Sequence, residues 1–194
     1  MSELSIFSIP ITLASASPRR KELMEKAGFI VEVQPIEFEE SYPLDLPAKE
    51  VALFIARKKA HAAKIAIQTE GVILTADSIV ILDDLLFGKP QDKQEAGAML
   101  RQLSDKEHQV VTGVCLIQGE KEKAFDSHTY VTLGRLTDTE IDYYIETWQP
   151  YDKAGAYGIQ DWIGWCKVTS IRGSYANVMG LPVAQVYTVL TEGF

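Results

Sequence analysis

Helix and strand signals alternate irregularly along the 194 residues of this chain, and their order restricts the folds that the chain can adopt. A short apolar run over residues 11–14 predicts a buried strand. Behind it, Ser17 suits the N-cap of a helix, Pro18 its first position and Gly28 the position just past its end. The start of the chain therefore predicts a strand-to-helix junction, which is typical of an α/β protein.

The rest of the chain continues this mixed pattern. The further predicted strands are residues 29–34, 72–75, 79–82, 108–117 and 125–133, and the further predicted helices are residues 47–67, 92–103, 137–148 and a short one from about 182. Residues 118–120 predict a hairpin, and Thr137 and Glu140 have the spacing of a capping box. Because helices and strands do not alternate strictly, we expect a mixed sheet flanked by helices. No linker divides the chain, so we expect one domain over residues 1–194.

Composition excludes several classes of protein. The chain is 46% hydrophobic and 24% charged, as expected for a globular domain and not for a disordered one. Its apolar runs are much shorter than the roughly 20 residues that span a bilayer. The net charge of −8 argues against a nucleic-acid-binding surface. Residues 1–10 do not resemble a secretory signal, so we expect a cytoplasmic protein whose Cys115 and Cys166 are reduced and buried.

Residues 15–20 read Ser-Ala-Ser-Pro-Arg-Arg and place two hydroxyls and two guanidinium groups at a predicted helix start. Helix N-termini attract anions, and arginine binds phosphate oxygens through paired hydrogen bonds. This pattern predicts an anion site that includes Ser15, Arg19 and Arg20. The alternative is a capped surface helix with exposed arginines.

Asp77 interrupts an apolar stretch over residues 74–80. An unpaired carboxylate would cost several kcal/mol to bury there, so Asp77 either meets a partner or faces a cleft where it binds metal or accepts a proton. The alternative is a turn aspartate between two strands. The acidic residues Glu37, Glu39 and Glu40 form either a solvated turn or part of a metal site.

Residues 152–160 combine Lys153 and Gln160 with small residues that let a flat ligand approach closely. The amide of Gln160 offers a donor and an acceptor to the edge of a nucleobase. An ordinary glycine-rich turn is the alternative. The three histidines show no metal-ligand spacing: we expect His61 to be partly exposed, and His108 and His128 to bond to the backbone.

Taken together and in this order, these segments resemble the Maf family of nucleoside triphosphate pyrophosphatases. The matching segments are residues 13–20, Glu40, and residues 56–60, 75–77, 88–90, 112–114, 152–160, 173–175 and 180–182. The resemblance implies an α/β domain related to inosine triphosphate pyrophosphatases, with an elongated mixed sheet and two lobes around a cleft. It also implies hydrolysis of a nucleoside triphosphate to the monophosphate and pyrophosphate with a divalent cation, Mg²⁺, Mn²⁺ or Co²⁺.

The resemblance also assigns roles to individual residues. Asp77 becomes the proton acceptor for the attacking water, with Glu40, Lys59 and Lys89 as further catalytic residues. Glu40 and Asp77 are the implied metal ligands. The implied substrate-binding residues are Ser15, Arg19, Arg20, Ser78, Lys153 and Gln160.

Three of these positions concern the base. The branch of the family that acts on dTTP and UTP has Arg, Thr and Gln there, and the branch that acts on 7-methyl-GTP has Trp, Gln and Glu. This chain has Arg19, Ser78 and Gln160, and Ser78 keeps the hydroxyl of the threonine that it replaces. We therefore expect dTTP and UTP as preferred substrates.

An alternative function is suggested by the family's association with septum formation, namely a nucleotide-responsive module that interacts with cell-division proteins. The presence of Lys59, Asp77 and Lys89 favours an enzyme. We expect no nucleic-acid or membrane partner, and a homodimer is compatible with the sequence.

Overall fold

The computed structural model describes residues 7–192. The strands are β1 (Ile11–Leu13), β2 (Val31–Val33), β3 (Val72–Leu82), β4 (Leu85–Phe87), β5 (Glu107–Gln118), β6 (Lys121–Leu133) and β7 (Val168–Arg172). The α-helices are α1 (Pro18–Lys26), α2 (Ala48–Ala66), α3 (Lys93–Leu103), α4 (Asp138–Trp148), α5 (Trp162–Lys167), α6 (Tyr175–Met179) and α7 (Val183–Thr191). The prediction that residues 1–10 are not a secretory signal falls partly on residues 1–6, which lie outside the described residues.

The strands form a seven-stranded sheet in the order β2-β1-β3-β5-β6-β7, and β4 pairs with β3. β1 runs parallel to β2 and β3, whereas the pairs β3–β4 and β6–β7 are antiparallel. β5 and β6 are joined through Gly119, which has a positive φ of 57°. The predicted mixed sheet flanked by helices is confirmed, and so is the hairpin. Within the described residues, no helix has the length and apolar composition needed to cross a membrane.

The described residues divide into two compact units. The first unit comprises residues 7–77, Thr112–Ser127 and residues 180–192, and the second comprises Ser78–Val111 and His128–Met179. The chain passes from one unit to the other within β3, directly after Asp77. The prediction of one domain over residues 1–194 stays a prediction.

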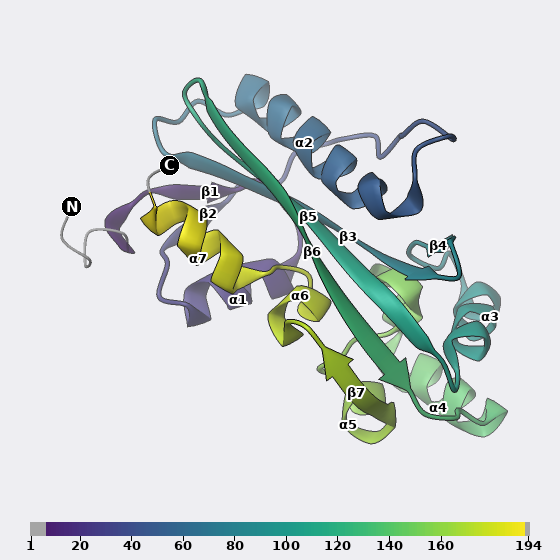
Figure 1. Cartoon of the computed structure of the whole chain (residues 1–194). Helices are drawn as coiled ribbons and strands as arrows, with labels where there is room; N and C mark the ends of the chain where they lie inside the picture. The colour runs from purple at the N-terminus through teal and green to yellow at the C-terminus, as the bar shows by residue number, and fades with distance from the viewer. Residues whose placement is uncertain (1–6, 193–194) are drawn as a thin grey trace. The chain divides into compact units, whose positions relative to one another are not determined.

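In the first unit, α2 covers one side of β1, β3 and β5 (Figure 1). The side chains that make this contact are Ala56 and Ala60 against Cys115 and Ile117, and Ala63 and Ile67 against Ala14 and Ile73. The helix approaches closely because its contact face consists largely of alanines. At Gly113 of β5 the two backbones approach so closely that a Cβ there would lie 2.3 Å from the Leu53 backbone nitrogen.

In the second unit, α3 and α4 pack with the strands around one apolar core. The largest fully buried side chains of this core are Leu100, Leu103, Leu133, Ile141, Tyr144, Ile145 and Ile163. α4 begins with the predicted capping box, in which Thr137 and Glu140 satisfy each other's backbone N–H groups. The predicted start of α3 at Asp92 is also confirmed, because its side chain accepts from the Glu95 N–H.

Two local expectations, the break in β3 and the burial of Cys166, were wrong. β3 is one continuous strand from Val72 to Leu82, so Asp77 lies within it and not in a turn between two strands. The prediction of Ser17 as the N-cap of α1 is confirmed, although its side chain makes no cap hydrogen bond. Cys166 is exposed, because it lies on the outer side of the short helix α5, whereas Cys115 is buried as expected and burial raises its pKa to about 12.

We expect Gly113→Ala to lower the free energy of unfolding by about 2–3 kcal/mol, because the new methyl group would push the α2 backbone off β5. Chemical denaturation measures this loss. Gly88→Ala is the matched control, since a Cβ at Gly88 would meet no atom of the described residues within 4 Å. Equal stability of the two variants would show that α2 does not depend on the close approach at Gly113.

Candidate active site

Lys59 of α2 joins two carboxylates in the first unit. Its Nζ donates to Asp77 Oδ1 at 2.8 Å and to Glu40 Oε1 at 2.6 Å. The side chains of Lys59 and Asp77 are only 14% and 11% exposed, whereas that of Glu40 is 45% exposed. The structure therefore brings together three residues that the sequence places far apart, and it gives the buried Asp77 the partner that its position requires.

The geometry of this pair follows from how α2 packs on β3. Thr75 and Asp77 lie on the same side of β3, since alternate residues of a strand share a face. The buried Thr75 hydroxyl donates to the Ala56 carbonyl at 2.7 Å, which ties the strand to α2 one turn before Lys59. This contact holds the helix at the register in which Lys59 reaches the carboxylate of Asp77.

Burial raises the pKa of the Asp77 carboxyl above its ordinary value. Lys59 and Arg20 oppose the shift by favouring the ionised form, and Glu40 adds to it. A carboxyl with a raised pKa is a stronger base once ionised, which suits a residue that accepts a proton from water. The role of Asp77 as a proton acceptor stays a prediction, and the raised pKa is compatible with it.

The predicted anion motif lies at the start of α1. Arg20 donates from Nε to the Gly180 carbonyl at 2.9 Å and from a terminal guanidinium nitrogen to Ser15 Oγ at 3.2 Å. Burial lowers the pKa of Arg20, while Asp77 and Glu40 raise it. Arg20 is thus half-buried, within electrostatic reach of Asp77, and fastened to the backbone before α7. The neighbouring Arg19 is also half-buried.

In the second unit, the segments that carry Lys89 and Lys153 lie side by side. The Gly155 N–H donates to the Gly88 carbonyl at 3.0 Å. Gly155 has a positive φ of 69°, and a Cβ there would lie 3.0 Å from Val80, so a glycine is required at this turn. Lys153 itself is 12% exposed, donates to Asp152 Oδ1 at 2.9 Å and lies 3.7 Å from Asp161 Oδ2.

The loop that carries Gln160 is held by residues that the sequence did not single out. The Tyr144 hydroxyl donates to Asp161 Oδ2 at 2.8 Å and accepts from the Gly158 N–H at 3.0 Å. The Trp165 indole N–H donates to the Gln160 carbonyl at 3.0 Å. Tyr144 belongs to the apolar face of α4 and therefore carried no separate signal. Ser78 follows Asp77 on β3, with its side chain on the opposite face.

The histidines differ in part from expectation. His61 is exposed and lies 3.1 Å from Glu122, as predicted for a surface histidine. His108 was expected to bond to the backbone, but its Nε2 lies 2.7 Å from the Tyr157 hydroxyl. His128 Nδ1 lies 2.8 Å from the side-chain amide of Gln109, and a backbone bond of His128 stays a prediction. His108 contacts a side chain because β5 buries it against the Tyr157 ring, and burial lowers its pKa to about 4.

No group of three or more acidic, histidine or cysteine side chains within the described residues could hold a metal ion. Glu40 and Asp77 together provide two carboxylates. Mg²⁺ is commonly bound by one or two carboxylates together with phosphate oxygens of the substrate. The two carboxylates thus fit a cation that also binds the phosphate oxygens of a triphosphate.

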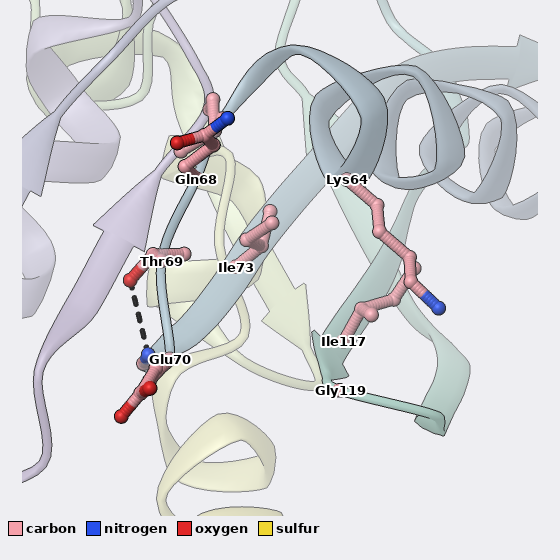
Figure 2. A pocket seen from close by; sticks show the side chains of 9 residues that line it. Lys64, Gln68, Thr69, Glu70, Ile73, Ile117 and Gly119 are labelled. Atoms are coloured by element: carbon pink, nitrogen blue, oxygen red, sulfur yellow. Dashed lines mark hydrogen bonds between the residues drawn. The ribbon is translucent and has the colours of Figure 1, made fainter.

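A separate pocket of about 500 Å³ lies at the start of β3 (Figure 2). Figure 2 shows Lys64 of α2 beside Ile117, with Gln68 on the segment that follows α2. None of the predicted site residues lines it. Ile73 precedes Asp77 by four positions, which corresponds to about 13 Å along a strand.

The chain is similar to a known protein family and to curated proteins over most of its length. Residues 10–193 match the family described as Maf-like protein. The chain belongs to this family. Within it, the chain is 50% identical to the dTTP/UTP pyrophosphatase of Phocaeicola vulgatus over 183 residues, which cover 94% of this chain and 95% of the relative. It is also 46% identical to the dTTP/UTP pyrophosphatase of Porphyromonas gingivalis, with 94% and 93% covered.

Solved structures are more distant. The nucleoside-triphosphatase (dITP/XTP pyrophosphatase) of Mycobacterium abscessus aligns with a TM-score of 0.40 at 20% identity, covering 66% of this chain and 76% of that one.

Because the folded pKa of Asp77 lies above its unfolded value, ionisation of this carboxyl destabilises the folded state. The loss of stability develops as the pH rises above the unfolded pKa of about 4. We therefore expect Asp77→Asn to raise Tm near pH 7 and to leave it almost unchanged near pH 3, as measured by thermal unfolding. The exposed Asp45 provides the control Asp45→Asn. A lower Tm for Asp77→Asn near pH 7 would show that the pairing with Lys59 outweighs the effect of burial.

Proposed function

We propose that this chain hydrolyses nucleoside triphosphates, with dTTP and UTP preferred, to the nucleoside monophosphate and pyrophosphate. The observation that carries the proposal is the buried Asp77–Lys59 pair with Glu40 beside it, in a chain whose curated relatives are named dTTP/UTP pyrophosphatase. A carboxylate next to several cations is the arrangement that hydrolysis of a phosphoanhydride requires.

Electrostatics supports local binding of the triphosphate. The chain has a net charge of −8, and a nucleoside triphosphate carries about −4, so the protein as a whole repels its substrate. Binding must therefore depend on cations concentrated at the site. In the first unit these are Arg19, Arg20 and Lys59, and we assign Lys89 and Lys153 of the second unit to the phosphates as well.

In the reaction, the oxygen of a water molecule attacks the α-phosphorus. The new P–O bond forms as the bond from the α-phosphorus to the oxygen bridging it to the β-phosphate breaks, and pyrophosphate leaves with that electron pair. Asp77 takes the proton of the water, and its raised pKa favours this transfer. Lys59 keeps the Asp77 carboxylate oriented and neutralises charge beside it.

Glu40 and Asp77 are the residues that would hold a divalent cation, for which we propose Mg²⁺, Mn²⁺ or Co²⁺. When bound, such a cation neutralises phosphate charge and polarises the P–O bonds. Glu40 is the more exposed of the two carboxylates. Its carboxylate can therefore leave Lys59 and bind a metal cation with less rearrangement of the surrounding side chains.

Base selection is assigned to Arg19, Ser78 and Gln160. A uracil or thymine edge presents one N–H between two carbonyls, and the neutral amide of Gln160 can match a donor and an acceptor of this edge. The hydrogen bond from Trp165 to the Gln160 carbonyl supports this assignment, because it fixes the backbone from which the amide extends. A cytoplasmic location and a homodimer stay predictions.

We expect UTP hydrolysed in isotopically oxygen-labelled water to yield labelled UMP and unlabelled pyrophosphate, because the attack is at the α-phosphorus. Activity should require Mg²⁺, Mn²⁺ or Co²⁺ and should be lost with a chelator. Mass spectrometry of the products measures both. Orthophosphate as the product, or label in pyrophosphate, would contradict the proposed reaction.

The matched variants for this experiment are Asp77→Asn and Asp45→Asn. The first should bind UTP but turn it over about a thousandfold more slowly, since it cannot accept the proton. The second should behave like the unchanged protein. Comparable turnover by Asp77→Asn would remove Asp77 from the mechanism.

We expect Gln160→Glu to lower kcat/KM for UTP and dTTP by about tenfold or more, because a carboxylate cannot donate a hydrogen bond and repels the base carbonyls. The activity on 7-methyl-GTP, which carries a positive charge on its base, should fall less or rise. Steady-state kinetics on the three substrates measures this ratio, with Gln185→Glu on the exposed side of α7 as the control. Equal losses on all substrates would show that Gln160 does not select the base.

A further inference from the structure

Lys58, next to Lys59 on α2, makes contacts that the proposed reaction does not use. Its Nζ donates to the backbone carbonyl of Ser41 at 3.0 Å and to the Ser41 hydroxyl at 3.1 Å. Ser41 directly follows Glu40 in the chain. One lysine of the pair thus binds the Glu40 carboxylate, and the other binds the backbone immediately after it.

Two aromatic rings complete the surroundings of Lys58. Its ammonium lies 5.5 Å from the centre of the Phe38 ring and 5.7 Å from that of Phe54, within the range of cation–π attraction. The Phe38 ring also lies 6.0 Å from the ammonium of Lys59. Because Phe38 precedes Glu40 by two residues, Lys58 holds the chain on both sides of Glu40.

Glu40 depends on such contacts because it lies outside any helix or strand. Between the end of β2 at Val33 and the start of α2 at Ala48, the chain forms no helix or strand. Fixing a residue in irregular chain costs conformational entropy. The two hydrogen bonds and the ring contacts of Lys58 offset this cost for the segment Phe38–Ser41.

We propose that Lys58 is a positioning residue that holds segment 38–41 and thereby sets the Glu40 carboxylate beside Lys59 and Asp77. Lys58 touches no reacting atom and acts through Glu40. This inference rests on the proposed function, because it assumes that Glu40 contributes to hydrolysis.

Lys58→Met keeps the length of the side chain but removes its charge and its donors. We expect kcat/KM for UTP to fall by about tenfold, and the backbone amides of residues 38–41 to exchange hydrogen faster. Lys58→Arg should retain most of the activity, since a guanidinium also stacks on aromatic rings and donates to oxygen. If Lys58 mattered only as packing, Met would serve as well as Arg. Lys64→Met, on the same helix, is the control and should change neither measurement.

A double-mutant cycle with Glu40→Gln tests whether Lys58 acts through Glu40. We expect the double variant to be no slower than Glu40→Gln alone, because the same contribution cannot be lost twice. Additive losses would overturn the inference, and so would unchanged exchange and activity in Lys58→Met. Should Lys58→Met not fold, Phe38→Leu removes one ring contact and should give the same effects in weaker form.

Hydrogen exchange is measured on the free protein and needs no catalysis. If the unchanged protein does not hydrolyse UTP, the proposed function fails, while the exchange data still decide whether Lys58 holds this segment. If Glu40→Gln is slow and Lys58→Met is not, the function stands and the inference fails.

Discussion

A carboxylate buried in the middle of a strand is the constraint around which the first unit is built. Asp77 would destabilise β3 if it had no partner, and Lys59 of α2 provides that partner. The pairing is achieved only if α2 lies close to the sheet and at one register. The alanines of α2, the glycine at position 113 and the Thr75–Ala56 hydrogen bond satisfy both conditions. Packing and chemistry in this unit therefore depend on the same contacts.

The surroundings of Asp77 lower the stability of the folded protein but favour the proposed reaction. Burial disfavours the ionised form of Asp77, and two carboxylates share one ammonium group. Arg20 adds positive charge but is itself partly desolvated and held by the Gly180 carbonyl. Such an arrangement is costly for the folded state, yet it keeps a base and several cations in place before substrate arrives, so that little reorganisation accompanies the reaction.

In the second unit, hydrogen bonds from the backbone and from Tyr144 hold the loops that carry Lys89, Lys153 and Gln160. Gly88 and Gly155 join the segments of Lys89 and Lys153 through the backbone, and Tyr144 connects Gly158 with Asp161. Tyr144 is buried in the apolar core of this unit, so the loop before Gln160 is held by a side chain of α4. Irregular segments thus gain defined geometry without regular secondary structure of their own.

The elements that could be predicted from the sequence are those with local signals: the start of α1 at Pro18, the capping box of α4, the β5–β6 hairpin and the order of the family motifs. These signals depend on residues close together in the sequence, so they can be recognised without knowledge of the fold. Four features became visible only in the folded chain: β3 continues through Asp77, His108 contacts Tyr157, Cys166 is exposed, and Lys58 contacts the chain on both sides of Glu40. Each of these depends on which side chain an element of the fold brings from a distant part of the chain, and such contacts are set by packing and not by local propensity.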